Sequence, residues 1–572
     1  MKYKFITISI LVITVLVYLL LKNSTANTQA LLNSNKFYVS YTADEQEAKL
    51  FELCKVWGIL KYHDTQFVNE NCKNDALIIK IFSEIEKNTT DFNTIISHCI
   101  EAFDTQKKVS NDIYFTDFPD KEWIESSLLI NRSNKVYLSH YILDSYNDSS
   151  ERMITKNKYG ELNFEKDNCF FDKTKTTKAM RFLSLCKIWN IIRYYYPYFD
   201  EISEDWNSVF FEMLPLFLDS KTENDYFIAV QKFTSKIKDS HVACKSINID
   251  DSSHKYVSNY ILKTIEGKTF VKDFVTNSLP TNLRKGDEIK MINGVSIVKM
   301  QDSLRELTSG SNEIVLLRDV NKILLFSNKQ VLNLQVLRNN QLLQINQKLT
   351  PIAIASEGEL TEHKSYASQT VSKILNKNIG YINCKEIFSG NFRISFEKIK
   401  NCSAIIFDLR SYPNETGIDF IKNFDLIENK PMILYSSDVI YPGFMRTIDE
   451  VVNVPKESND SYSRPVVLLI NEYTQSQGES LLLAMRSSIK NSISIGDFTA
   501  GTNGNITVVS LPGGIKTRFS GIGILTANFG NTQRLGIKPD ILIREDINTL
   551  LKGEDIQLKR ALNFINTMQN EN

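Results

Sequence analysis

The chain has 572 residues, of which 42% are hydrophobic and 23% are charged, the composition of a folded globular protein. A chain of this length exceeds a single hydrophobic core, so several domains are expected. Its 67 basic residues balance its 67 acidic residues, and it has no long run of lysine or arginine. This balance argues against nucleic acid binding through a basic surface, and no nucleic acid partner is predicted.

The first segment of the chain has the pattern of an export signal. Lys2 and Lys4 precede an apolar or hydroxyl-bearing stretch at residues 5–21, and small residues follow it. Residues 1–26 are therefore expected to form a signal peptide that is cleaved or a membrane anchor that is retained. Because the basic residues come first, the rest of the chain is predicted to be exported, to the periplasm or the cell envelope.

An internal repeat follows the signal segment. Residues 53–62 and 185–194 agree at most positions, and their apolar residues at three- and four-residue spacing predict a helix in each copy. We interpret residues 27–150 as a degenerate helical repeat unit and residues 151–250 as a second helical domain.

One of the six histidines stands out because of its position between elements. His241 follows an amphipathic segment and precedes a run of short strands, although a histidine at such a place is often a surface or cap residue. The Ser97-His98 pair of the first repeat imitates Ser240-His241. No core of alternating strands and helices follows it directly, so we interpret His98 as structural.

The eight cysteines are too few for a disulfide scaffold in so long a chain. The sequence leaves the pairing of any disulfide open. No CxxC or histidine-rich spacing indicates a metal, and no metal and no cofactor is predicted.

The middle and the end of the chain have different patterns. Residues 283–294 predict a strand with a turn at each end, within a β-rich domain at residues 255–350. From Ile379 onward strands and helices alternate, which predicts right-handed βαβ crossovers and an α/β core at residues 351–572.

A hydroxyl lies at a junction between strand and helix in this core. The apolar run at residues 465–471 predicts a buried strand, and Ser476 opens the helix that follows. Free backbone amides at a helix start can bind an oxyanion, so Ser476 is a candidate nucleophile. The alternative is a capping box, with Ser476 as the N-cap and Glu479 three residues later.

Together these motifs resemble the C-terminal-processing (tail-specific) serine peptidase family, in its tricorn-like branch that uses a histidine. The resemblance covers about residues 180–545, with four motifs in the family's order. They are Asp-Ser-His at residues 239–241, Asp-Leu-Arg ending a strand at residues 408–410, Ser-Gln-Gly-Glu at residues 476–479 and Gly-Ile-Lys-Pro-Asp at residues 536–540.

The resemblance implies a multidomain α+β fold with a crotonase/ClpP-like α/β spiral as catalytic core and an embedded PDZ-like domain. A PDZ-like domain binds extended peptide termini, although a small β-domain acting only as a spacer is the alternative. The implied activity is an exported serine endopeptidase that cleaves flexible polypeptides by acyl-enzyme chemistry.

The resemblance also implies the site residues. The candidate catalytic residues are Ser476, His241, Ser240 and Gln533, and the candidate oxyanion donors are the backbone amides of Gln477 and of Asn414 or Glu415. Gln533 stands where the branch has an acid, and a carboxamide cannot offset an imidazolium charge. Asp239 and Glu479 are substitutes for that acid.

Two other functions stay open. An inactive or weakly active homologue could keep the fold and hold peptides in the cleft and the PDZ-like domain. A scaffold that recruits a glycan or a partner protein through the duplicated helical region is the third reading, and only the repeat favours it.

Overall fold

The structure is a computed structural model, and it divides into two compact units, Met1–Asp44 and Glu45–Asn572. It describes residues 44–63, 71–103, 118–146, 152–249, 255–274, 281–324, 326–352, 371–376, 378–414, 418–427, 431–448 and 461–571. The predicted export segment at residues 5–21 lies outside these ranges. Within them, no helix combines the length and the apolar character that a membrane crossing requires.

The helical region contains both copies of the repeat as helices, as predicted. Its elements are α2 (Glu45–Tyr62), α3 (Asn71–Lys87), α4 (Phe92–Phe103), α5 (Lys121–Ser126), α6 (Arg132–Tyr146), α7 (Lys178–Tyr195), η1 (Phe199–Glu201), α8 (Trp206–Leu218) and α9 (Glu223–Ser235). A short hairpin, β1 (Thr155–Lys156) and β2 (Leu162–Asn163), lies between α6 and α7.

The two copies of the repeat contact each other through α2 and α7. The Asn190 side chain donates a hydrogen bond to the Cys54 carbonyl at 3.0 Å. This approach requires a glycine in the facing helix, since a Cβ atom on Gly58 would lie 2.1 Å from Asn190 Oδ1. A disulfide between Cys72 and Cys169 also links the first copy to the segment that precedes α7.

The middle of the chain forms a β-rich unit. Its sheet has the order β11-β10-β7-β6-β5, with all neighbours antiparallel, and two helices accompany it. The elements are β5 (Tyr260–Ile265), β6 (Lys268–Phe274), β7 (Glu288–Ile292), β8 (Val295–Ser296), α10 (Ile297–Arg305), α11 (Glu313–Ile323), β10 (Val331–Arg338) and β11 (Gln341–Lys348). A small sheet adjoins them, made of β4 (Tyr256–Val257), β9 (Phe326–Ser327) and β12 (Thr350–Pro351).

The strand and turn predicted at residues 283–294 are present as β7 and a turn at Asn293 and Gly294, both with positive φ. A PDZ-like identity for this unit stays a prediction, as do the domain boundaries given above.

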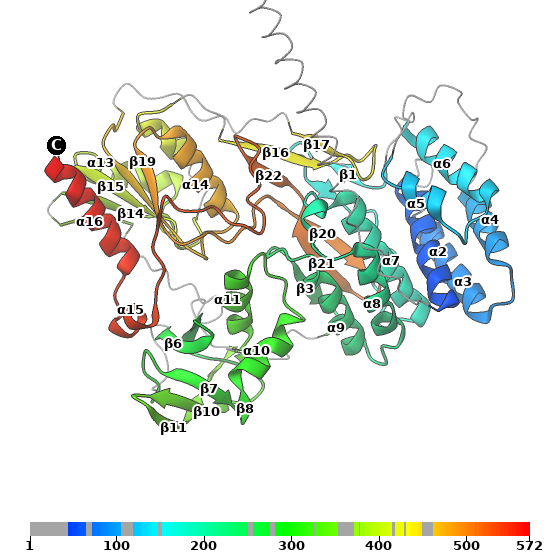
Figure 1. The fold of residues 1–572 in the computed structure, drawn as a ribbon, viewed down its shortest axis with the longest axis horizontal. Coiled ribbons are helices and arrows are strands. Elements are labelled where there is room, and N and C mark those ends of the chain that lie inside the picture. The colour runs from blue at the N-terminus through cyan, green and yellow to red at the C-terminus, as the bar shows by residue number, and fades with distance from the viewer. Residues whose placement is uncertain are drawn as a thin grey trace, which may run out of the picture. The chain divides into compact units, whose positions relative to one another are not determined.

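The last part of the chain forms the α/β core (Figure 1). Its sheet has the order β13-β14-β15-β18-β19-β23, parallel except for β13. The elements are β13 (Ser372–Leu375), β14 (Ile379–Asn383), α13 (Ser389–Ile399), β15 (Ala404–Asp408), η4 (Ile418–Asn423), β18 (Val466–Ile470), α14 (Gln477–Ser488), β19 (Ser492–Gly496), β23 (Ile541–Leu542), α15 (Ile547–Lys552) and α16 (Ile556–Glu571).

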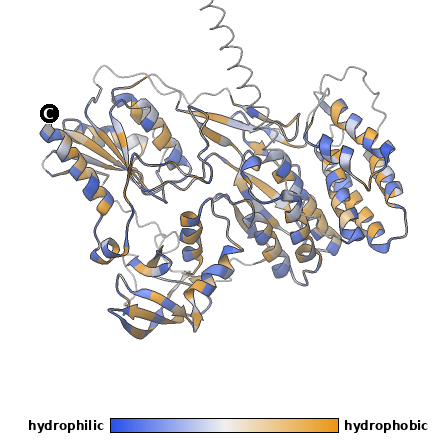
Figure 2. Ribbon diagram, in the orientation of Figure 1, coloured by the Kyte–Doolittle hydropathy of each residue, from blue (hydrophilic) through white to orange (hydrophobic). Residues whose placement is uncertain are grey.

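The two faces of this sheet bury separate apolar clusters. Helices α13 and α14 cover one face and α16 covers the other. Strands β15 and β18 are therefore buried at every residue, and the strands of this sheet are largely orange in Figure 2. The mixed α+β class and the βαβ crossovers predicted from the sequence are confirmed.

Two three-stranded sheets join the core to the helical region. One has the order β20-β21-β3, from β3 (Ala243–Ser246), β20 (Ile506–Leu511) and β21 (Ile515–Ser520). The other contains β16 (Met432–Ser437), β17 (Met445–Thr447) and β22 (Gly523–Thr526). Strand β3 begins two residues after His241, and its pairing with β21 brings that histidine to the core.

Candidate active site

Ser476 lies in a strained turn between β18 and α14. Its backbone has φ +52° and ψ −114°, a conformation that non-glycine residues rarely adopt. A strained strand-to-helix turn is how a nucleophilic serine is exposed in other hydrolases. Ser476 occupies the N-cap position, as the capping alternative predicts, and Glu479 at N3 accepts from its backbone N–H, as in a capping box.

The buried Glu479 carboxylate stabilises this turn by accepting hydrogen bonds from it and from a neighbouring loop. It is fully buried, and its Oε2 accepts hydrogen bonds from the backbone N–H groups of Ser476 at 3.2 Å and Thr502 at 3.0 Å. Its Oε1 accepts from Thr499 Oγ1 at 2.5 Å and from Gly501 N at 2.9 Å. Burial raises the pKa of Glu479 to about 7, although these hydrogen bonds oppose the rise. The carboxylate thus ties the 499–502 loop to the serine turn.

His241 is oriented by Asp239 and Ser520, both of which are fully buried. Its Nδ1 forms a hydrogen bond of 2.8 Å with Ser520 Oγ. The Asp239 carboxylate accepts from the backbone N–H groups of His241 at 2.9 Å and Ser520 at 2.7 Å. Burial lowers the pKa of His241 from its ordinary value, and the Asp239 charge opposes this. The imidazole is therefore neutral at pH 7 and can act as a base.

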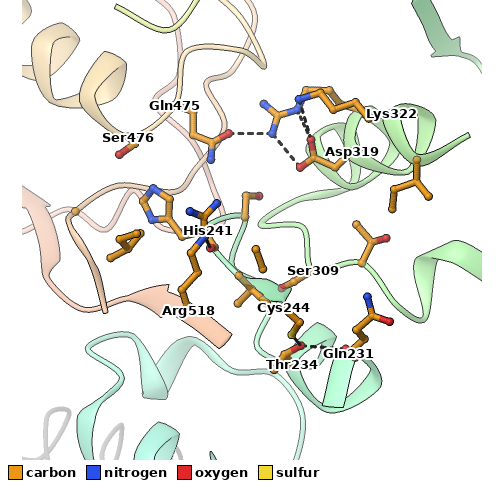
Figure 3. A pocket seen from close by; sticks show the side chains of 18 of the residues that line it. Gln231, Thr234, His241, Cys244, Ser309, Asp319, Lys322, Gln475, Ser476 and Arg518 are labelled. Carbon is orange, nitrogen blue, oxygen red and sulfur yellow. Dashed lines mark hydrogen bonds and ion pairs between the residues drawn. The ribbon is translucent and has the colours of Figure 1, made fainter. Parts of the chain in front are cut away.

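Ser476 and His241 line one pocket of about 940 Å³ (Figure 3). The helical region, the β-rich unit and the core all contribute to it, through side chains that include Gln231, Cys244, Asp319, Lys322, Tyr412, Tyr473 and Arg518. Among the described contacts, no hydrogen bond joins Ser476 Oγ to the imidazole. Hydrogen bonds between catalytic groups are often long before substrate binds, so this arrangement is compatible with a serine–histidine pair.

Ser240 lines the same pocket, and among the described contacts no hydrogen bond joins its hydroxyl to the imidazole. Its Oγ bonds to Ser311 Oγ at 2.8 Å and accepts from Ser311 N at 2.9 Å. Ser311 Oγ bonds in turn to Thr502 Oγ1. This hydroxyl cluster connects the β-rich unit to the serine turn. The Ser240 hydroxyl therefore bonds within this cluster and not to a candidate catalytic group.

Gln533 is buried and does not line the pocket that Ser476 and His241 share. Its Nε2 donates to Tyr196 Oη at 3.4 Å, and its Oε1 has no hydrogen-bond partner among the described residues. Within the same ranges, no hydrogen bond connects it to Ser476 or His241. The role that the resemblance assigns to Gln533 therefore has no contact to support it in this structure.

The two candidate oxyanion donors differ in whether their backbone amides already have a hydrogen-bond acceptor. The Gln477 backbone amide is the first of α14, where no intrahelical acceptor exists. The Asn414 amide instead donates to the Cys384 carbonyl at 3.3 Å. Glu415 lies outside the described residues. One donor is thus available for an oxyanion, and the Asn414 donor is engaged.

Ser520 is the functional residue that reasoning from the sequence missed. The alternating pattern of β21 shows that Lys516, Arg518 and Ser520 share a face, but it does not show what that face meets. Only the pairing of β3 with β21 places Ser520 against His241. Within the described ranges, no group of three histidine, cysteine or acidic residues could hold a metal ion.

The fold and this site define a serine peptidase. Residues 378–543, which make up most of the α/β core, match the model of peptidase family S41. No curated protein matches the chain significantly.

Solved structures agree on the fold. Mature CPAF in complex with lactacystin is 12% identical over 69% of this chain and 99% of its own, with a TM-score of 0.55. A CPAF mutant is 11% identical over 66% of this chain and 94% of its own, with a TM-score of 0.51. The identity is low, so these structures support the fold alone.

Proposed function

We propose that this protein is an exported serine endopeptidase that cleaves flexible polypeptides through an acyl-enzyme on Ser476. The backbone of Ser476 is the observation that carries the proposal. A φ of +52° at a serine costs free energy, on the order of 1–3 kcal/mol for such outliers, and it is retained here at a residue that lines the pocket. A catalytic hydroxyl directed into the pocket explains both facts.

In the proposed mechanism His241 acts first as base and then as acid. With Nδ1–H donating to Ser520 Oγ, the Nε2 lone pair is free to accept the proton of Ser476 as its oxygen attacks the peptide carbonyl. The imidazolium then donates that proton to the leaving amine. Water repeats the sequence on the ester and releases the acid product.

Ser520 takes the orienting position, in place of the acid that the resemblance leads one to expect. Its hydroxyl holds the Nδ1 edge of the His241 ring, while the Asp239 carboxylate fixes Ser520 through its backbone. The negative charge of Asp239 is next to the ring without being its hydrogen-bond partner. This arrangement supports the imidazolium less than a direct carboxylate does, so a modest turnover is expected.

The oxyanion is bound by the Gln477 amide at the start of α14 and by a second donor from the loop after β15. Such donors each contribute about 3–4 kcal/mol to lowering the barrier in acyl-transfer enzymes. The Asn414 amide serves as that second donor after its hydrogen bond to Cys384 breaks, or the amide of Glu415 serves instead.

Two observations support export. The apolar stretch at residues 5–21 follows two lysines, as in a signal peptide or an anchor. The Cys72–Cys169 disulfide is stable in an oxidising compartment such as the periplasm or the cell surface. We place the protein there, with residues 5–21 either cleaved or retained as a membrane anchor.

The size of the pocket and its composition support a polypeptide substrate. It lies between three parts of the chain, and Tyr412 and Tyr473 give it aromatic surface beside its charged side chains. The β-rich unit presents β11 at one end of its sheet, where an extended chain end can add as a further strand. PDZ-like peptide binding is therefore part of the proposal.

Labelling with a fluorophosphonate probe tests the nucleophile. We expect the purified protein to be labelled at Ser476 and to cleave an unfolded protein such as reduced casein. Ser476→Ala should lose both activities, whereas Ser480→Ala, in the first turn of the same helix, should keep them. Equal cleavage by the Ser476→Ala protein would refute the proposal.

The second candidate is a silent homologue that binds peptides without cleaving them. It is favoured by the placement of Gln533 against Tyr196 and by the engaged Asn414 amide. Covalent labelling of Ser476 would exclude this candidate. Peptide binding without labelling would establish it.

A further inference from the structure

Arg518 lies beside the candidate catalytic histidine. It is on β21, where alternate residues share one face, so it projects on the same side as Ser520. Its Cα pairs with Ala243, two residues after His241. In Figure 3 its side chain reaches up to the level of the imidazole, below Gln475.

The guanidinium of Arg518 is fixed at one nitrogen only. Its Nε donates to the backbone carbonyl of His241 at 3.1 Å, and Arg518 lines the pocket. Within the described part of the chain, no hydrogen bond is made by its two terminal nitrogens and no carboxylate pairs with it. A fixed guanidinium with both terminal nitrogens available is suited to bidentate binding of a carboxylate.

The other strong charges of the pocket already have partners. Arg318 forms two hydrogen bonds to Asp319, at 2.9 Å each, and Lys322 lies 3.6 Å from the same carboxylate. Glu161 accepts from the side-chain amides of Asn157 and Asn505. Arg518 is exposed, so a polypeptide in this pocket would displace water from it, and a carboxylate of the substrate would replace that water with charge-assisted hydrogen bonds.

We propose that Arg518 is a carboxylate-binding subsite that selects polypeptides with an acidic side chain close to the bond at Ser476. This inference rests on the proposed function, because it takes the pocket to be the polypeptide site. It adds the chemistry of the preferred substrate, which the fold and the family do not specify.

Peptide binding to the full-length Ser476→Ala protein tests the subsite without requiring catalysis. Fluorescein-labelled peptides of one neutral sequence are compared at fixed ionic strength, with Glu or Gln at a single central position. Each is made with a free and with an amidated C-terminus. We expect the Glu peptides to bind about tenfold more tightly than the Gln peptides with either C-terminus, read from fluorescence anisotropy. A preference that depends only on the free C-terminus overturns the inference.

Substitutions at Arg518 then assign the effect. In the Ser476→Ala background, Arg518→Gln should reduce the ratio of the Kd of the Gln peptide to that of the Glu peptide to about one. Arg518→Glu should make the protein prefer a matching Lys peptide over the Glu peptide. Lys516→Gln is the matched control. Lys516 shares the face of β21, but it lies over the Phe171 ring at 5.2 Å and does not line the pocket. Its substitution should leave the ratio unchanged.

The outcomes separate this inference from the proposed function. Equal affinity for all four peptides, or a preference that survives Arg518→Gln, overturns the subsite, even if the wild-type protein cleaves casein. An Arg518-dependent preference in a protein whose Ser476 is never labelled keeps the subsite and refutes the peptidase mechanism.

Discussion

The two copies of the helical repeat show how similar sequences acquire different chemistry. Each copy has a Ser-His pair downstream, Ser97-His98 in the first and Ser240-His241 in the second. His98 is an exposed residue within α4, whereas His241 is buried between α9 and β3. The difference arises after the repeat, because only the second copy continues into a strand that pairs with the core. A histidine becomes a candidate base here through its strand partner.

Removing each histidine in turn is the strongest test of whether only the second copy supplies a catalytic base. His241→Ala should lower kcat for casein or a quenched peptide by about 10³- to 10⁴-fold, because the general base is lost. His98→Ala should change kcat by less than about twofold, since His98 does not line the pocket. Comparable losses in both proteins would contradict the assignment.

Substituting the orienting hydroxyl sharpens the comparison further. Ser520→Ala should lower kcat by about 10- to 100-fold with little change in KM, because the imidazole ring is no longer held at Nδ1. Ser520→Thr keeps the hydroxyl and should recover part of the loss. Ser240→Ala removes the serine that the sequence favoured, and it should lower kcat less than Ser520→Ala does. The reverse order would restore Ser240 to the catalytic role.

Contact between the two repeat copies can be tested through stability. Gly58→Ala places a Cβ atom 2.1 Å from Asn190 Oδ1 and should destabilise the helical region by about 1–3 kcal/mol, read as a lower Tm. Asn190→Ala removes the obstructing side chain, so the double variant should lose less than the sum of the single variants. Additive losses would show that α2 and α7 do not contact each other at this point.

The pH dependence gives the smallest effect. Burial lowers the pKa of His241, so the acidic limb of the kcat/KM profile should have an apparent pKa below about 6.5. The native protein then binds fewer protons at this site than the unfolded chain does. The stability that neutral His241 contributes is therefore present at neutral pH and is lost as the pH falls through the lowered pKa. An acidic limb above 6.5 would contradict the buried position.

Much of the fold could be predicted from local pattern. Apolar spacing in residues 53–62 and 185–194 predicted α2 and α7, and the apolar run before Ser476 predicted β18. These predictions succeed because the hydrophobic period of a helix or a buried strand is a property of the segment itself. The S41 match then confirmed the family that the motifs indicated.

The candidate site could be predicted only in part. The sequence marked Ser476 and His241, and the structure brings both to one pocket. The sequence also named Gln533 as a candidate orienting group. In the structure Gln533 bonds to Tyr196, and Ser520 is the residue whose hydroxyl bonds to His241. A motif gives an order along the chain, and it does not say which side chains meet after folding.

By itself, the sequence determined which segments form helices and strands, where a helix start with free backbone amides lies and which charges are available. The tertiary structure decided which strand pairs with β3, and so which hydroxyl meets the imidazole and which arginine stands beside it. The physical reason is that the local elements depend on the period of neighbouring residues, while the site depends on β-pairing between segments far apart in the chain, which no local period encodes.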